Sequence, residues 1–237
     1  MKKIARLLTF VLLAVAFTAF AGCDVMEVKP YVPSEDKYFI FTDVAGADGE
    51  TIGCAVQYNV AWEGDAPETL KLPTVSGDKP VIAVADGGFS KLNVKSVTVP
   101  SSVKTIGANA FKQCKQLEKV YFYSEGNKQG CETIGDYAFS ECTSLVDLDL
   151  PKSLREIGAF AFEYTALKSL DLPHYVVKVG AFAFNTCTEL KNISVAVNLA
   201  EVGDGAFSGC SSELVIKVAE SNPYFYFKDG KLVKKSA

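Results

Sequence analysis

Seven cysteines and one histidine are the side chains with the most reactive chemistry in this 237-residue sequence. A zinc site needs closely spaced ligands such as C-x-x-C, and no such pair or nearby histidine occurs. A serine hydrolase would need His174 as its base, but no G-x-S-x-G segment accompanies it. We therefore predict that the protein is not an enzyme, holds no metal or cofactor, and has His174 in a surface turn.

The elements that would position these side chains begin after an apparent export signal. Lys2, Lys3 and Arg6 form a basic start, followed by an apolar run at 7–20 that is shorter than the ~20 residues of a membrane-spanning helix. The end of this segment, "TAFAGC", resembles the lipobox of bacterial lipoproteins, with Phe20 in place of the usual leucine. The resemblance implies that residues 1–22 are removed and that Cys23 is lipidated, so that the protein is exported and anchored to a membrane. The alternative is an ordinary signal peptide with a chance cysteine.

Net charge argues against a nucleic-acid partner. The formal charge is −4, and removal of the three basic residues of the signal leaves 21 basic and 28 acidic residues, or −7. An acidic chain has no electrostatic footprint for nucleic acid or anionic lipid.

A nine-residue segment recurs through the middle of the chain, which indicates one structural unit made several times. Five good copies are "IGANAFKQC" at 106, "IGDYAFSEC" at 134, "IGAFAFEYT" at 157, "VGAFAFNTC" at 179 and "VGDGAFSGC" at 202, with a degenerate copy, "VADGGFSKL", at 84. Each good copy follows a segment of alternating apolar residues, such as Leu167, Leu170 and Leu172, that predicts a short strand. A unit of about 23 residues cannot close a core alone, so neighbouring copies must stack into a solenoid. The second-position glycine of each copy should permit a positive φ or close backbone packing.

The string "SLVDLDLPKSLREIGAFAFEYTALKSLDLP" resembles the BspA-like leucine-rich repeat family, the 23-residue class found in bacterial surface lipoproteins. The C-terminal "NPYFYFKDGKLVKK" resembles the hairpin that often ends such arrays, with Asp229-Gly230 as its turn. The resemblance implies an α/β-type leucine-rich repeat solenoid, right-handed, with a parallel β-sheet on its concave face and short helical or irregular segments on its convex face. It also implies adhesion to host or matrix proteins or to other cells.

These observations divide the chain into five parts. We expect a signal peptide at 1–22, a lipidated cysteine and tether at 23–36, a strand-rich N-terminal cap at 37–69, leucine-rich repeats at 70–220 and a capping hairpin at 221–237. The cap contains two expected strands, "KYFIFTD" and "CAVQYNVAW".

Four cysteines hold the last position of the repeated segment: Cys114, Cys142, Cys187 and Cys210. Two interpretations are open, disulfides between adjacent copies or a column of buried thiols, and we favour the thiols because stacked side chains run parallel to one another. Cys131 lies in an insertion at 123–132 that lengthens one repeat, either a functional loop or a tolerated surface insertion, and it is the one thiol that we would test for reactivity.

The remaining candidate site is the outward face of the expected strands, because repeat proteins usually bind through their extended strand surface. The candidate protein-binding residues are Lys95, Thr98, Glu118, Lys119, Tyr121, Asp147, Asp149, Lys168, Asp171, Lys191, Asn192 and Ser194. The sequence favours a surface-exposed recognition protein, on the outer membrane or cell surface, with a protein ligand. One alternative is that these residues form only a solvated face. Another is that the chain is a periplasm-facing structural or assembly lipoprotein, for which Asp24 gives slight support.

Overall fold

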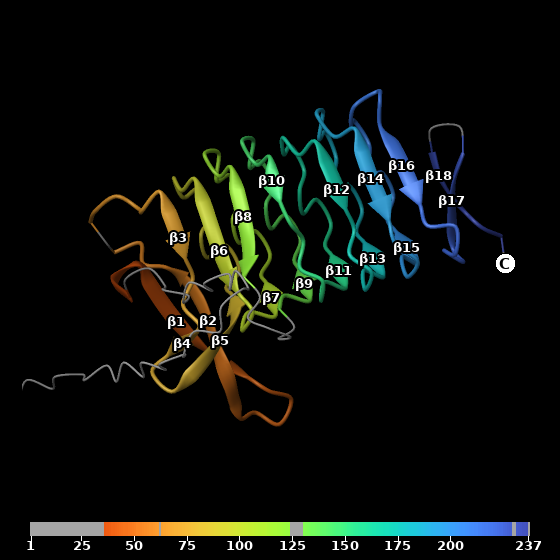
Figure 1. Ribbon diagram of the computed structural model, residues 1–237. Coiled ribbons are helices and arrows are strands. Elements are labelled where there is room, and N and C mark those ends of the chain that lie inside the picture. The colour runs from red at the N-terminus through yellow and green to blue at the C-terminus, as the bar shows by residue number, and fades with distance from the viewer. Residues whose placement is uncertain (1–35, 62, 124–129, 229–230, 237) are drawn as a thin grey trace, which may run out of the picture. The chain divides into compact units, whose positions relative to one another are not determined.

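The computed structural model describes residues 36–61, 63–123, 130–228 and 231–236, all within one compact unit, Val32–Ala237. The signal peptide, Cys23, most of the tether and insertion, and the Asp229-Gly230 turn lie outside the described residues. In the described part of the chain, strands alternate with turns, and the one helix is a 3-10 turn at Asp36–Tyr38. The stacked strands form a parallel β-solenoid of about seven turns, which confirms the solenoid prediction (Figure 1).

One long sheet runs through the unit and begins with an antiparallel pair. β1 (Phe39–Ala45) pairs with β2 (Thr51–Tyr58), so two strands occur where they were expected, although β2 begins before Cys54 and ends at Tyr58. The parallel order then continues through β5 (Lys79–Val84), β7 (Thr105–Ile106), β9 (Thr133–Ile134), β11 (Glu156–Ile157), β13 (Lys178–Val179) and β15 (Glu201–Val202), and β4 (Val75–Ser76) pairs with β5. Each short strand enters the repeated nine-residue segment, so this sheet joins one repeat to the next.

A second set of parallel strands forms the other side of the array, with one strand from each repeat (Figure 1). Its strands are β3 (Thr69–Lys71), β6 (Ser96–Pro100), β8 (Lys119–Tyr123), β10 (Asp147–Leu148), β12 (Ser169–Asp171), β14 (Asn192–Val195) and β16 (Val215–Val218). The set is divided into two sheets, β3–β6–β8–β10 and β12–β14–β16. We call the outward surface of these seven strands the strand face.

In the described residues, the repeated segments form turns. The short helices that were one of the two expectations for these segments are not seen there. Two residues in each copy have a left-handed backbone, for example Phe160 (φ 55°) and Tyr164 (φ 57°). Between these two positions, every second amide donates to a carbonyl of the next repeat. Phe160 N donates to Ala181 O at 3.0 Å and Phe162 N donates to Ala183 O at 2.8 Å. The turns are therefore held together by a backbone ladder of their own.

The second-position glycines allow close backbone packing, and the positive-φ alternative is wrong for them. Positive φ falls instead on the fourth and eighth positions, such as Asn109 and Gln113. A Cβ added to Gly180 would lie 2.5 Å from Ala159 N and 2.5 Å from Gly158 C of the preceding repeat. The glycine column exists because consecutive backbones touch there.

The core is a continuous column of phenylalanine rings, one from each repeat. The rings of Phe89, Phe111, Phe139, Phe162, Phe184 and Phe207 stack in order, with centroids 5.2–5.7 Å apart. Leucine, valine and isoleucine side chains of the strands fill the space around them. A second, partly exposed stack joins Tyr137, Phe160 and Phe182, with centroids at 4.7 Å and 5.1 Å.

A hairpin follows the last repeat, made of β17 (Phe225–Lys228) and β18 (Lys231–Lys234). Asn222 fixes its entry. The buried Asn222 side chain donates from Nδ2 to Ala196 O and Leu199 O, and its Oδ1 accepts from the amides of Tyr224 and Phe225. The "NP" dipeptide that marks the tail in the sequence thus ties the hairpin to the final repeat.

Candidate functional site

Cross-strand register arranges the strand-face residues in columns. One column begins Lys71–Thr98–Tyr121 on β3, β6 and β8, and the corresponding residues of β12, β14 and β16 are Asp171, Ser194 and Lys217. A neighbouring column contains Ser96, Lys119 and Asp147, and beyond the division between the sheets Ser169, Asn192 and Val215. A period of two sends the residues of these columns to the same side of the strands. The predicted residues Lys95, Glu118, Lys168 and Lys191 lie just before the strands instead.

The predicted residues differ in exposure. Tyr121 is 42% exposed, and Val146, which lies opposite Glu118 in the next repeat, is 45% exposed. Asp149, Asp171, Lys191, Asn192 and Ser194 are also exposed, as are Lys95, Glu118 and Lys168, whereas Thr98, Lys119 and Asp147 are half-buried. The sequence-based prediction omitted Lys71, Val215 and Lys217, which share the same columns. The alternation in "TLKL" and "ELVIKV" is the signal that would have found them.

Three ion pairs cross the strand face between neighbouring repeats. Lys95 Nζ lies 2.7 Å from Glu68 Oε1, Lys119 Nζ lies 3.5 Å from Asp147 Oδ2, and Lys191 Nζ lies 2.8 Å from Glu213 Oε2. Tyr121 and Asp147 together raise the pKa of Lys119, and the hydrogen bond to Lys191 lowers the pKa of Glu213. All these groups are solvated, so water and salt screen the pairs and they contribute little to stability. Their effect is to give the surface a fixed, mixed pattern of charge.

Tyr121 is the exposed aromatic side chain among the predicted binding residues. It lies between Thr98 on β6 and, past the end of β10, the exposed carboxylate of Asp149. An aromatic ring with charged neighbours can pack against an apolar side chain and hydrogen-bond at its edge, which suits protein recognition.

The described cysteines are free thiols, which confirms the preferred interpretation over disulfides. Each thiol of the column donates to a phenylalanine carbonyl of the preceding repeat: Cys114 to Phe89, Cys142 to Phe111, Cys187 to Phe162 and Cys210 to Phe184, at 3.0–3.2 Å. Thr165 occupies the same position in the remaining copy and bonds within its own turn, to Phe162 O at 2.9 Å. These thiols are structural donors.

Cys131, the thiol singled out for a test of reactivity, lies in an environment that disfavours reactivity. Its side chain is 1% exposed and its Sγ donates to Thr133 O at 3.3 Å. Burial raises the pKa of this thiol to about 12, so almost no thiolate exists at neutral pH. The position of Cys131 in a sequence insertion suggested exposure, but its backbone has already returned to the core.

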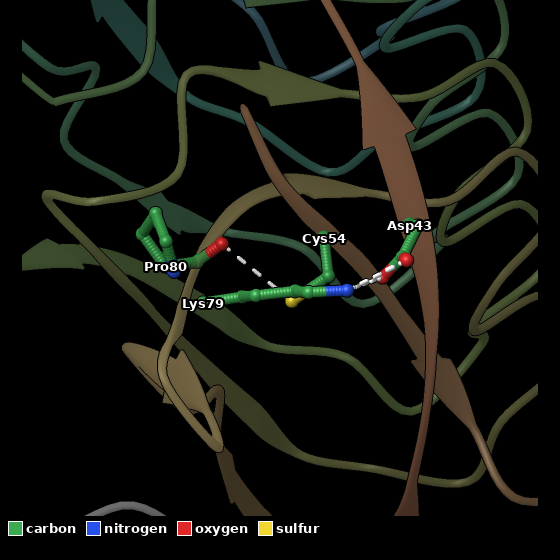
Figure 2. A network of polar contacts seen from close by, with 4 residues as sticks. All are labelled: Asp43, Cys54, Lys79 and Pro80. Atoms are coloured by element: carbon green, nitrogen blue, oxygen red, sulfur yellow. Dashed lines mark hydrogen bonds and ion pairs between the residues drawn. The ribbon is translucent and has the colours of Figure 1, made fainter. Parts of the chain in front are cut away.

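Asp43, Cys54 and Lys79 form a polar cluster near the start of the chain (Figure 2). Lys79 Nζ bonds both carboxylate oxygens of Asp43, at 2.6 Å and 2.7 Å, and so links β5 to β1 across β2. Cys54 Sγ donates to Pro80 O at 3.5 Å, and burial followed by the charge of Asp43 raises the pKa of the thiol. The cluster contains no activated nucleophile and serves to hold the three strands together.

His174 lies on the surface, as expected, with its ring 5.2 Å from that of Tyr175. Within the described ranges there is no group of three or more His, Cys, Asp or Glu residues that could hold a metal ion. The same part of the chain has no helix with the length and hydropathy to cross a membrane.

The repeated strand, turn and glycine geometry defines a leucine-rich repeat solenoid. The sequence matches the BspA type leucine-rich repeat region in six copies, over residues 68–129 and 125–226. The chain belongs to this family.

Solved structures agree with this assignment. A leucine-rich repeat protein of T. pallidum is 29% identical, with a TM-score of 0.68, covering 79% of this chain and 82% of the other. A leucine-rich cell surface protein of Faecalibacterium prausnitzii is 23% identical (TM-score 0.57; 88% and 60% covered), and the pneumococcal vaccine antigen PcpA is 20% identical (TM-score 0.53; 86% and 54% covered). The last two show the fold alone. A comparison with curated protein sequences gave no significant match.

Proposed function

We propose that the protein is an exported, lipid-anchored recognition protein that binds a protein ligand through the strand face. The observation that carries this proposal is the register itself, which places variable polar residues and Tyr121 in columns over several strands. Repeat arrays with such a surface typically bind macromolecules and have no catalytic role. The family match and the shared fold with a leucine-rich cell surface protein support a role in protein binding outside the cytoplasm.

The ligand in this proposal is a host, matrix or neighbouring-cell protein, bound at many points along the strand face. The face would be the concave side of a right-handed array. Several strands contribute exposed side chains, and many anchored copies would multiply a modest affinity for each contact. Cys23 would carry the lipid that holds the protein at the cell surface.

Substitution of Tyr121 tests the binding face. Tyr121→Ala and Lys119→Ala should each weaken binding to immobilised extracellular matrix proteins about tenfold, because they remove the aromatic anchor and its neighbouring cation. Tyr164→Ala is a matched control, since Tyr164 is 47% exposed but lies in a turn segment. Surface plasmon resonance would measure the three variants. If the control loses as much affinity as the Tyr121 variant, the strand face around the third strand is not the site.

Cell-surface exposure is tested separately on intact cells. The proposal expects protease added outside to remove the protein, and expects a Cys23→Ser variant to lose incorporation of labelled palmitate and to leave the membrane fraction. Full protection until the outer membrane is breached would favour the alternative, a periplasm-facing structural or assembly lipoprotein.

A further inference from the structure

The C-terminal end of the long sheet is open. β15 pairs with β13 on one side and is the last strand of the sheet. In the inner repeats, each glycine amide bonds the strand carbonyl of the preceding repeat, as Gly203 N does to Val179 O at 2.8 Å. Within the described residues, Val202 O has no such partner.

The last turn segment is open in the same way. Phe182 N, Phe184 N and Thr186 N donate to the carbonyls of Asp204, Ala206 and Ser208 in the final copy, at 3.0, 2.8 and 2.7 Å. The corresponding amides of the final copy are those of Gly205, Phe207 and Gly209, and in the described part of the chain these have no backbone partner. Three amides and the carbonyl of Val202 are therefore placed where a further repeat would form hydrogen bonds with them.

Apolar surface accompanies these groups. Val202 and Phe207 are half-buried, whereas their counterparts Val179 and Phe184 are 1% and 0% exposed. A cavity of about 850 Å³ lies between the last two repeats and the hairpin, with apolar walls from Val202, Ala206, Phe207, Ile216, Phe225 and Leu232. This volume is within the range of pockets that bind ligands. The hairpin lies beside β16 (Figure 1), and among the described strands β15 pairs with β13 alone.

The charge of this edge specifies what can bind. Along the sheet, Glu156, Lys178 and Glu201 are directly opposite one another on successive strands, with alternating sign. Directly opposed charges on neighbouring strands stabilise when they differ and destabilise when they match. A strand added to β15 should therefore place a basic residue beside Glu201. Twofold pairing of β15 with a second copy would instead offer Glu201 no basic partner on the added strand, because that strand consists of Glu201 and Val202.

We infer that the β15 edge binds an extended segment of a partner protein, in which a basic residue is followed by a branched aliphatic residue and glycine. The basic residue continues the charge alternation, and the aliphatic residue covers Val202. The glycine allows the same close backbone contact that the second-position glycines make at the other repeat junctions. Main-chain hydrogen bonds to Val202 O and to the three free amides supply the rest of the recognition, as in strand addition. This site is separate from the strand face and does not depend on the proposed function.

The probe for this inference is the peptide VVKVGAFAFNT, which is the sequence of residues 176–186 and includes the three carbonyls, those of Ala181, Ala183 and Asn185, that would face the free amides. Binding to the full-length chain, purified in detergent, is measured by fluorescence polarisation. A peptide with Glu in place of its Lys should bind at least threefold more weakly. The Glu201→Lys variant should reverse that preference, binding the Glu peptide better than the Lys peptide.

Glu156→Lys is the matched control, since it changes the net charge equally in the same column, two strands inside the edge. It should leave the peptide preference unchanged. Bound peptide should also slow hydrogen exchange at the amides of Gly205, Phe207 and Gly209. The inference fails if the peptide binds no better than a scrambled sequence, or if both variants shift the preference equally. It also fails if the chain dimerises in sedimentation experiments in a way that Glu201→Lys abolishes, because the edge would then belong to a second copy.

Discussion

At the scale of single residues, the thiols show how chemistry is removed from a reactive side chain. Cysteine fits the ninth position because it is small, apolar and able to donate to a carbonyl that the turn leaves open. Cys142 donates to Phe111 O, and burial raises its pKa well above the ordinary value. The cysteine column is thus a set of core hydrogen bonds.

The raised thiol pKa predicts a loss of stability in alkali. Cys131 holds its proton up to a pKa of about 12 when folded, while the unfolded thiol ionises near 9. Between these values the unfolded state binds fewer protons, so the free energy of unfolding should fall as pH rises, by about 2 kcal/mol per such thiol at pH 10.5. Cys131→Ser should lack this contribution. Urea unfolding at pH 8 and pH 10.5 measures it, and equal pH slopes for the two proteins would contradict it.

The glycine column gives a second prediction at this scale. Gly180→Ala should reduce the free energy of unfolding by about 2–3 kcal/mol, because the new Cβ would collide with the backbone of the preceding repeat. Gly130→Ala is the control, since the nearest atom to its Cβ would be Ser101 Cα at 3.7 Å. Its effect should stay within ~0.5 kcal/mol. Comparable losses in urea unfolding would show that the contact does not explain the column.

At the scale of elements, the two aromatic stacks should differ in their contribution to stability. Phe139→Ala removes a fully buried ring between Phe111 and Phe162 and should cost about 3–5 kcal/mol. Tyr137→Ala in the same turn removes a partly exposed ring stacked on Phe160, at a cost of about 1 kcal/mol. Thermal and urea unfolding of the two variants separate these values. Equal costs would mean that the outer stack is a second core.

Much of the element level could be predicted from the sequence because its signals are local and repeated. Period-two alternation located the strands, and near-identical copies established the stacking. The turn ladder could not be predicted in this way. Its two left-handed positions carry residues as different as Asn109, Phe160 and Gly205, so no single residue type marks them. The burial of Cys131 was missed for a related reason, since an insertion in sequence does not show where the chain re-enters the core.

At the scale of the whole molecule, a solenoid is only as continuous as its repeat junctions. At the junction between the repeats of β10 and β12, the long sheet is continuous but the strand face is divided. Across it, β11 pairs with β13 and β9, whereas among the described strands β10 has no pairing with β12. Leu148 and Leu150 on one side are half-buried, in contrast to Leu170 and Leu172 on the other, at 3% and 5% exposure. The strand face should therefore open more readily here than elsewhere, next to the exposed Val146.

Hydrogen exchange should detect this weak junction. Val146 N donates to Glu118 O at 3.1 Å and Lys191 N donates to Lys168 O at 3.0 Å, while the equivalent bond from Lys168 N to Val146 O is not formed. The Lys168 amide should therefore exchange at least tenfold faster than the amides of Val146 and Lys191, which occupy the same place in adjacent repeats. Glycine amides of the opposite sheet at this junction, such as Gly158 and Gly180, should remain protected, because each bonds the preceding repeat at 2.8 Å. Uniform protection of the three strand-face amides would show that the two strand-face sheets move as one, and a ligand that bridges the strand face should then leave the exchange of Lys168 unchanged.

If the junction is weak, a protein bound across β8 and β12 should slow exchange at Lys168 more than at the equivalent amides of other repeats. Recognition would then be coupled to the rigidity of the array.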